Sequence, residues 1–118
     1  FGLLGHSCEM AEGSGVAIEY EVSQFRFIEE AIELAKEGLL PEGMYRNRAF
    51  AECRVDPGEA ELWQQDLLYD PQTSGGLLMA VDPEDADALL RELEGKVPAA
   101  QRIGRAVEYD GGAYIRLR

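Results

Sequence analysis

The chain has few of the side chains that hold metal ions or form disulfides. Only Cys8 and Cys53 are present, with no Cys-x-x-Cys spacing, and His6 is the single histidine. Neither a disulfide framework nor a zinc site is indicated, and we expect two reduced thiols in a cytoplasmic protein. A lone imidazole near a helix start is more often a capping or packing group than a base, so we assign His6 no catalytic role.

Long apolar runs and an excess of basic residues are also missing. No stretch approaches the roughly 20 apolar residues that span a bilayer, and the first residues lack the order of a signal peptide. Lysine and arginine number 11 against 23 aspartates and glutamates, which gives a formal net charge of −12. Because this charge repels nucleic acid and anionic lipid, we expect neither a nucleic acid nor a membrane as partner.

The length and composition suit one compact domain. The chain has 118 residues, of which 46% are hydrophobic, and this is enough to build a core. We therefore expect residues 1–118 to form a single domain. The sequence starts abruptly at Phe1 without an initiator methionine, which suggests a piece of a longer protein whose fold is complete and whose function is not.

Hydrophobic periodicity predicts a mixture of helices and strands. Alternating residues at 16–22 predict a strand. Leu40–Arg54 has no clear period, so we expect mostly loop there. Asp56-Pro57-Gly58-Glu59 has the form of a helix opening, and that helix should run to about Leu68. Apolar residues recur at helical spacing in three further segments, at 3–11, 28–39 and 82–93.

Two further segments predict the rest of the sheet. The apolar run Leu77–Val81 follows a cluster of turn formers and predicts a buried central strand. Residues 103–109 and 113–117 flank Asp110-Gly111-Gly112 and predict a hairpin. The expected fold is α+β, a roughly four-stranded mixed or antiparallel sheet with about four helices packed on it.

The segment Asp70–Gly76 is the strongest candidate for a binding site. Its small residues allow backbone amides and the hydroxyls of Thr73 and Ser74 to approach a phosphate or another anion. A plain tight turn into the next strand explains the same residues. Spacing alone does not decide between these two interpretations.

Two weaker candidates accompany this loop. Gly2 and Gly5 flank a helix start whose amides could face a ligand, although helix packing explains these glycines equally well. Arg46-Asn47-Arg48 could bind a phosphate or carboxylate, but in so acidic a chain we expect these arginines to pair with its own carboxylates. No acidic pair marks a magnesium site, and neither glycine-rich stretch continues into Gly-Lys-Ser or Gly-Lys-Thr as in a P-loop.

Several segments together resemble the C-terminal half of selenophosphate synthetases (selenide, water dikinases), within the aminoimidazole ribonucleotide synthetase superfamily. They are Phe1-Gly2-Leu3-Leu4-Gly5-His6, Glu9-Met10-Ala11, Met44-Tyr45-Arg46-Asn47 and Asp70-Pro71-Gln72-Thr73-Ser74-Gly75-Gly76-Leu77-Leu78. The Asp-Pro-Gln-Thr-Ser-Gly-Gly segment is the most specific of them. Their order and spacing cover nearly the whole chain.

The resemblance implies a two-domain, usually dimeric enzyme. It converts ATP, selenide and water into selenophosphate, AMP and phosphate, with Mg²⁺ gathered by aspartates. The family's reactive Cys or selenocysteine, its Lys and a magnesium-binding Asp precede the residues present here. We therefore expect a domain that is inactive alone and monomeric, with no catalytic residue, metal site or tightly bound cofactor. Its expected partner is the missing N-terminal domain.

The resemblance also implies where a nucleotide would lie. A set of small residues should line the cleft that faces the ATP phosphates, with Arg46 and Asn47 as contacts at its rim. This set comprises Gly2, Gly5, Thr73, Ser74, Gly75 and Gly76. The alternatives are another ATP-using member of the superfamily (aminoimidazole ribonucleotide synthetase, thiamine-monophosphate kinase or a hydrogenase maturation factor) and a stand-alone acidic interaction module.

Overall fold

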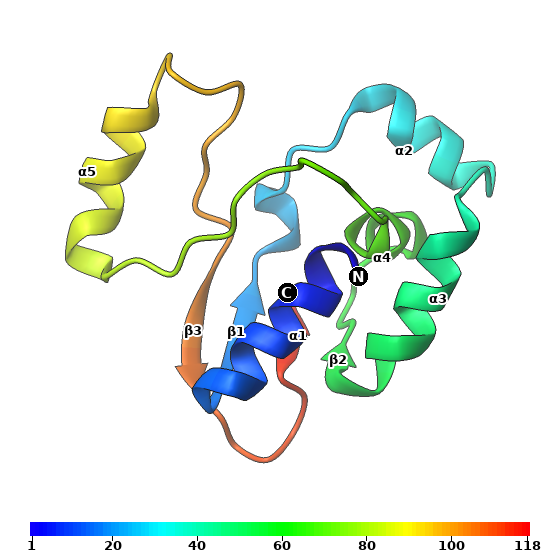
Figure 1. Cartoon of the computed structure of the whole chain (residues 1–118), viewed down its shortest axis with the longest axis horizontal. Helices are drawn as coiled ribbons and strands as arrows, with labels where there is room; N and C mark the ends of the chain where they lie inside the picture. Colours follow the sequence, from blue (N-terminus) through cyan, green and yellow to red (C-terminus); the bar gives the residue numbers. More distant parts are fainter.

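The computed structural model describes all 118 residues and shows a small sheet packed against helices, with one further helix to the side (Figure 1). The helices are α1 (Gly2–Ser14), α2 (Glu29–Lys36), α3 (Glu42–Ala51), α4 (Leu62–Tyr69) and α5 (Pro83–Leu93), with the short 3₁₀ turns η1 (Val22–Gln24) and η2 (Glu52–Arg54). The strands are β1 (Val16–Tyr20), β2 (Val55–Asp56), β3 (Gly104–Glu108) and β4 (Ile115–Leu117). The predicted α+β class is confirmed, and so are the elements expected near α1, β1, α2 and α5. No helix is long and apolar enough to cross a membrane.

The sheet is mixed, with the strand order β2-β4-β1-β3. β1 pairs antiparallel with β3 and parallel with β4, while β2 pairs parallel with β4. The predicted hairpin is therefore wrong, because β1 lies between its two strands. The turn at Asp110–Gly112 does reverse the chain, but residues 109–114 are long enough to cross the roughly 10 Å that separates two strands with a third between them.

The core lies between α1 and the inner face of the sheet. Leu4, Cys8 and Ala11 of α1 are fully buried at helical spacing. These side chains pack in one cluster with alternate residues of the sheet and with residues of α3 and α4. The sheet residues are Ile18, Tyr20, Ile115 and Leu117, and the helix residues are Met44, Leu68 and Tyr69. α1 contacts α3, α4 and the sheet, so it is the central helix of the domain.

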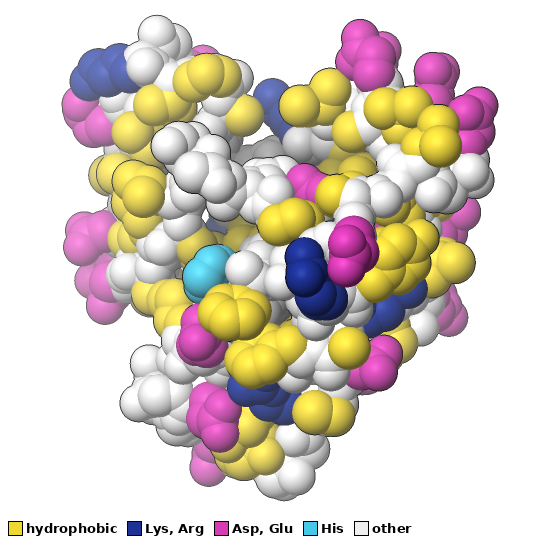
Figure 2. Space-filling model, turned by 45° about the vertical axis from the view of Figure 1, so that its right-hand side comes forward, with side chains coloured by type: hydrophobic (Ala, Val, Ile, Leu, Met, Phe, Trp, Pro, Cys, Tyr) yellow, Lys and Arg dark blue, Asp and Glu magenta, His cyan; other side chains and the backbone are white.

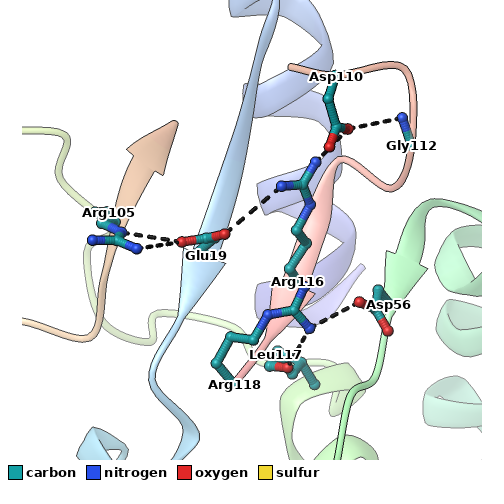
Figure 3. Close-up of polar contacts among 8 residues, drawn as sticks. All are labelled: Glu19, Asp56, Arg105, Asp110, Gly112, Arg116, Leu117 and Arg118. Atoms are coloured by element: carbon teal, nitrogen blue, oxygen red, sulfur yellow. Dashed lines mark hydrogen bonds and ion pairs between the residues drawn. The ribbon is translucent and has the colours of Figure 1, made fainter. Parts of the chain in front are cut away.

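The outer face of the sheet carries a row of charged side chains (Figure 3). Glu19 on β1 accepts two hydrogen bonds from Arg105 on β3, the shorter of 2.8 Å, and lies 3.7 Å from Arg116 on β4. Arg116 also contacts Asp110, and Arg118 donates to Asp56 at 2.8 Å. Opposite charges thus alternate across the strands and partly neutralise one another.

α3 occupies a region for which the sequence predicts mostly loop, and that prediction is wrong. The buried residues of α3 are Met44, Asn47 and Ala51, a helical spacing in which the middle position is polar. A search for hydrophobic periodicity misses a helix whose inward face includes an amide.

The predicted helix start at Asp56 is also wrong. Asp56 ends β2, and its carboxylate accepts from the Gly58 amide and from Arg118. α4 begins only at Leu62, after a capping box formed by Glu61 and Gln64. An aspartate followed by proline and glycine suits a tight turn as well as a helix start, and the pairing of β2 with β4 decides between them.

Leu77–Val81 forms no strand, contrary to the prediction. Leu77 is 87% exposed, and only Leu78 of this run packs against the core. The run is sufficiently apolar for a strand, but it forms no ladder with any edge of the sheet. It leads instead to α5, which begins as predicted with the Asp82 carboxylate accepting from the Glu84 amide and which has no fully buried residue.

Candidate functional site

The start of α1 meets the end of α4, and this junction positions the predicted phosphate-facing residues. Gly2 has a backbone φ of +68°, and a Cβ added there would lie 2.6 Å from the carbonyl carbon of Tyr69. Only glycine combines this left-handed conformation with so close an approach of two backbones. Gly2 therefore lies directly beside the residue that precedes the Asp70–Gly76 loop.

Asn47 of α3 also contacts the backbone of Tyr69. It is buried, and its Nδ2 donates a hydrogen bond of 2.8 Å to the carbonyl oxygen of Tyr69. Next along the chain, Pro71 packs against Gly43, where an added Cβ would lie 2.9 Å from the proline Cγ. α3 thus fixes where the loop begins. The structure places Asn47 in the interior, whereas the family resemblance implies a contact at the rim.

The Thr73–Gly76 segment lies at the surface. All four residues are exposed, and their backbone amides form no hydrogen bond with another backbone group. Ser74 has a positive φ of 56°, a conformation uncommon outside glycine. Unpaired amides next to a left-handed residue can bind an anion, so the loop can supply the donors that the sequence predicts.

Gly5 and His6 follow each other on α1, and Gly5 is buried. A Cβ at Gly5 would lie 2.5 Å from the Cβ of Phe1, so this glycine lets Phe1 fold back over the helix. His6 is exposed, and its Nδ1 lies 3.3 Å from a carboxylate oxygen of Glu9. No hydrogen bond, ion pair or ring contact joins His6 to the Thr73–Gly76 loop.

The two arginines of α3 pair with carboxylates of the chain, as expected. Arg46 is exposed and lies 3.8 Å from Glu42, one helical turn earlier. Arg48 forms a largely buried ion pair with Asp66 of α4, and its guanidinium lies 5.6 Å from the ring centre of Tyr69. Arg46 can still turn toward a ligand at the surface, whereas Arg48 is held between α3 and α4.

Two surface pockets lie outside the Thr73–Gly76 segment. One of about 470 Å³ is lined by Arg48, Glu52, Cys53, Val55, Pro57, Gln65 and Tyr69. The other, of about 310 Å³, is lined by Glu19, Glu21, Gln24, Arg102, Gly104 and Arg105. The residues from Thr73 to Gly76 line neither of these two pockets, and all four are exposed.

Comparison with known proteins identifies the family. Residues 1–116 match the family described as AIR synthase related protein, C-terminal domain. This chain belongs to that family. Among its relatives is a selenide, water dikinase of Clostridioides difficile, 44% identical over 118 residues that cover 99% of this chain and 34% of the relative.

Other relatives of this AIR synthase related C-terminal domain carry similar names. A selenide, water dikinase of Caldanaerobacter subterraneus is 44% identical over 120 residues, covering 98% of this chain and 34% of the relative. The selenide, water dikinase 2 of Peptoclostridium acidaminophilum is 46% identical over 117 residues, covering 98% and 33%. The chain therefore spans about a third of the length of these relatives.

Three buried side chains near the α1–α4 junction of this AIR synthase related domain, one thiol and two hydroxyls, are neutral at physiological pH. Burial raises the pKa of the Cys8 thiol to about 11 and those of the Tyr20 and Tyr69 hydroxyls to about 12. A thiol with so high a pKa is a poor nucleophile. No group of three or more His, Cys, Asp or Glu side chains could hold a metal ion. The exposed Thr73–Gly76 segment carries two hydroxyl groups and backbone amides that have no backbone partner.

Proposed function

We propose that this chain is the C-terminal domain of a two-domain selenide, water dikinase, which converts ATP, selenide and water into selenophosphate, AMP and phosphate. One observation carries the proposal: relatives of that name are 44–46% identical to this chain over 98–99% of its length. The domain has no catalytic residue of its own and is inactive without the N-terminal domain.

Within this proposal, the domain contributes donors for the ATP phosphates. Phosphoryl transfer develops charge on oxygen atoms, and preorganised amides stabilise it without a bulky side chain. Gly2, Gly5 and the Thr73–Gly76 loop line the cleft, and Arg46 lies at its rim. The exposed, unpaired amides of the loop support this role. Asn47 acts indirectly, since it fixes the carbonyl of Tyr69 just before the loop.

The remaining components belong to the rest of the parent enzyme. Aspartates of the N-terminal domain bind Mg²⁺, as the family resemblance implies. A reactive Cys or selenocysteine near the parent's N-terminus handles selenium. The parent is a cytoplasmic homodimer built mainly through its N-terminal domain, and the isolated domain is a monomer.

Phosphorus NMR of the parent enzyme tests the proposed reaction. The protein is incubated with Mg²⁺ and ATP, with and without selenide. We expect a selenophosphate signal and AMP only when selenide is present. ATP left intact, or ADP formed regardless of selenide, would assign the parent to another ATP-using enzyme of the superfamily and refute the proposal.

A further inference from the structure

Three ring side chains form an exposed patch at the start of the chain, which we call the aromatic patch: Phe1, His6 and Phe50. The rings of Phe1 and Phe50 are stacked with their centres 4.6 Å apart, and His6 meets Phe1 edge-on at 5.8 Å. Phe1 is 52% exposed and Phe50 is 41% exposed. Figure 2 shows the histidine beside a group of hydrophobic side chains on this face of the molecule.

The aromatic patch is an ordered surface joining two helices. Phe1 caps the start of α1, while Phe50 comes from the last turn of α3. Gly5 provides the space in which Phe1 folds back. The guanidinium of Arg54 lies 4.5 Å from the ring centre of Phe50, and Arg54 is itself held by Glu12 at 3.3 Å. A polar margin thus borders an apolar centre, as in a docking surface.

The length of the relatives indicates what covers the aromatic patch. The chain matches a C-terminal domain and spans about a third of relatives of the proposed function, so in the parent enzyme about two thirds of the polypeptide precedes Phe1. The residue before Phe1 is covalently bonded to a member of the patch, and neighbouring Cα atoms are only about 3.8 Å apart. The preceding segment therefore leaves the domain next to the patch. A second copy of this chain is a poorer candidate, since each copy has a net charge of −12.

We propose that the aromatic patch is the docking surface for the segment that immediately precedes Phe1 in the parent polypeptide. That segment packs on the rings of Phe1 and Phe50 and thereby anchors the first turn of α1. Because Gly2 lies in this turn beside Tyr69, docking sets the position of the α1–α4 junction relative to the rest of the parent. The inference rests on the proposed function for the existence of the parent, but not on its chemistry.

Hydroxyl-radical footprinting of the full-length parent tests this proposal. Tyr45 is the internal control, because it is 52% exposed on the same helix and lies about 140° around α3 from Phe50. In this domain alone the two rings are similarly exposed. In the parent we expect Phe50 to be oxidised about fivefold more slowly than Tyr45, because a docked segment excludes water from its ring. Equal oxidation of the two rings would overturn the proposal.

Dilution and substitution distinguish the possible occupants. Protection of Phe50 that disappears on dilution would show that a second copy covers it, and would also overturn the proposal. In the full-length protein, Phe50→Asp should speed amide exchange in the segment before Phe1 by about tenfold, whereas Tyr45→Asp should leave it unchanged. If Phe50→Asp does not fold, the wild-type footprint still decides. Footprinting requires neither ATP nor selenide, so failure of docking and failure of the proposed reaction are separately visible.

Discussion

Gly2 brings two backbones closer together than any other residue would allow. An added Cβ would lie within 2.9 Å of three backbone atoms of Tyr69, at a positive φ. Backbone atoms cannot turn aside as a flexible side chain can. The backbones of Gly2 and Tyr69 must therefore move apart if a methyl group is added at position 2.

The first prediction follows from this contact. Gly2→Ala should lower the free energy of unfolding by about 2 kcal/mol or more, because the positive φ and the backbone clash both oppose alanine. Gly13→Ala is the matched control in the same helix, because an added Cβ there meets no atom within 4 Å. This substitution should raise the free energy of unfolding by up to about 1 kcal/mol. Urea denaturation measures both, and similar results for the two variants would contradict the close contact.

Gly75 differs from Gly2, although the sequence presents both as candidate site residues. A Cβ at Gly75 meets only the Gln72 side chain, with Oε1 at 3.2 Å, and a flexible side chain can move. Gly75→Val should therefore change stability little. In the proposed parent enzyme it should slow selenophosphate formation by about 100-fold, because the side chain would obstruct the amides that we propose face the phosphates.

Gly13→Val provides the control for this second prediction, since Gly13 lies in open space at the far end of α1. Its parent variant should keep full activity. Thermal unfolding and phosphorus NMR of both variants separate stability from chemistry. If Gly75→Val loses stability and activity together, the loop is a structural turn and nothing more.

Residue types at the site could be predicted, but their partners could not. The glycines and hydroxyls of the loop stand out in the sequence because of their conformational freedom and donor groups. The partner of Asn47 is 22 residues away, and no local pattern connects an amide in one helix with the last carbonyl of another. Long-range partners depend on tertiary packing, which spacing does not reveal.

At the scale of elements, α1 and α5 have opposite environments. α1 has fully buried residues along its length, whereas the apolar stripe of α5 is only half-buried. Both helices begin and end where sequence signals indicate. Helical periodicity predicts that the apolar face of a helix is buried, but it predicts neither the element that packs on this face nor the extent of burial.

This contrast gives a third prediction. Leu4→Ala should lower the free energy of unfolding by about 2–5 kcal/mol, because it leaves a cavity in the core. Leu90→Ala in α5 should lower it by about 1 kcal/mol or less, because less apolar surface is lost. Urea titrations of the two variants check this. Equal losses would show that α5 packs into the core in solution.

β1, β3 and β4 lie where the sequence predicts strands, but their pairing and the remaining strand could not be predicted. β1 alternates clearly and was expected, but β2 is two residues long and carries too little pattern to be detected. The Leu77–Val81 run was expected to be central and pairs with no strand. A strand is stabilised by its neighbours, so its existence depends on edges that the local sequence does not show.

For the whole molecule, the charged row on the sheet links stability to pH. Hydrogen bonds from Arg105 to Glu19, from Arg118 to Asp56, and from the Gly112 amide to Asp110 hold the pKa values of these three carboxyls below their ordinary range. A lowered pKa in the folded state means that the unfolded chain binds more protons. Folding is therefore favoured above the ordinary pKa values, and this contribution is lost as the pH falls through the folded ones.

The fourth prediction is an acid-dependent loss of stability. Between about pH 5 and pH 3 the urea midpoint should fall steadily. Glu19→Gln should make this decrease shallower, since it removes one of the three carboxyls, and Glu84→Gln is an exposed control outside the row. Added salt should weaken the effect, because solvent still reaches all three carboxylates. A variant that follows the wild-type curve would show that Glu19 contributes nothing to it.

The position of β4 between β1 and β2 determines when the domain can assemble during synthesis. β1 and β2 are made early, yet neither pairs with the other, and both pair with residues 115–117. During synthesis on the ribosome, one edge of β1 and the pairing edge of β2 therefore stay unpaired until residues 115–117 emerge. Such late, distant closure slows folding and leaves strand edges exposed to other nascent chains. A chaperone that shields unpaired strand edges would therefore act mainly before residues 115–117 have emerged.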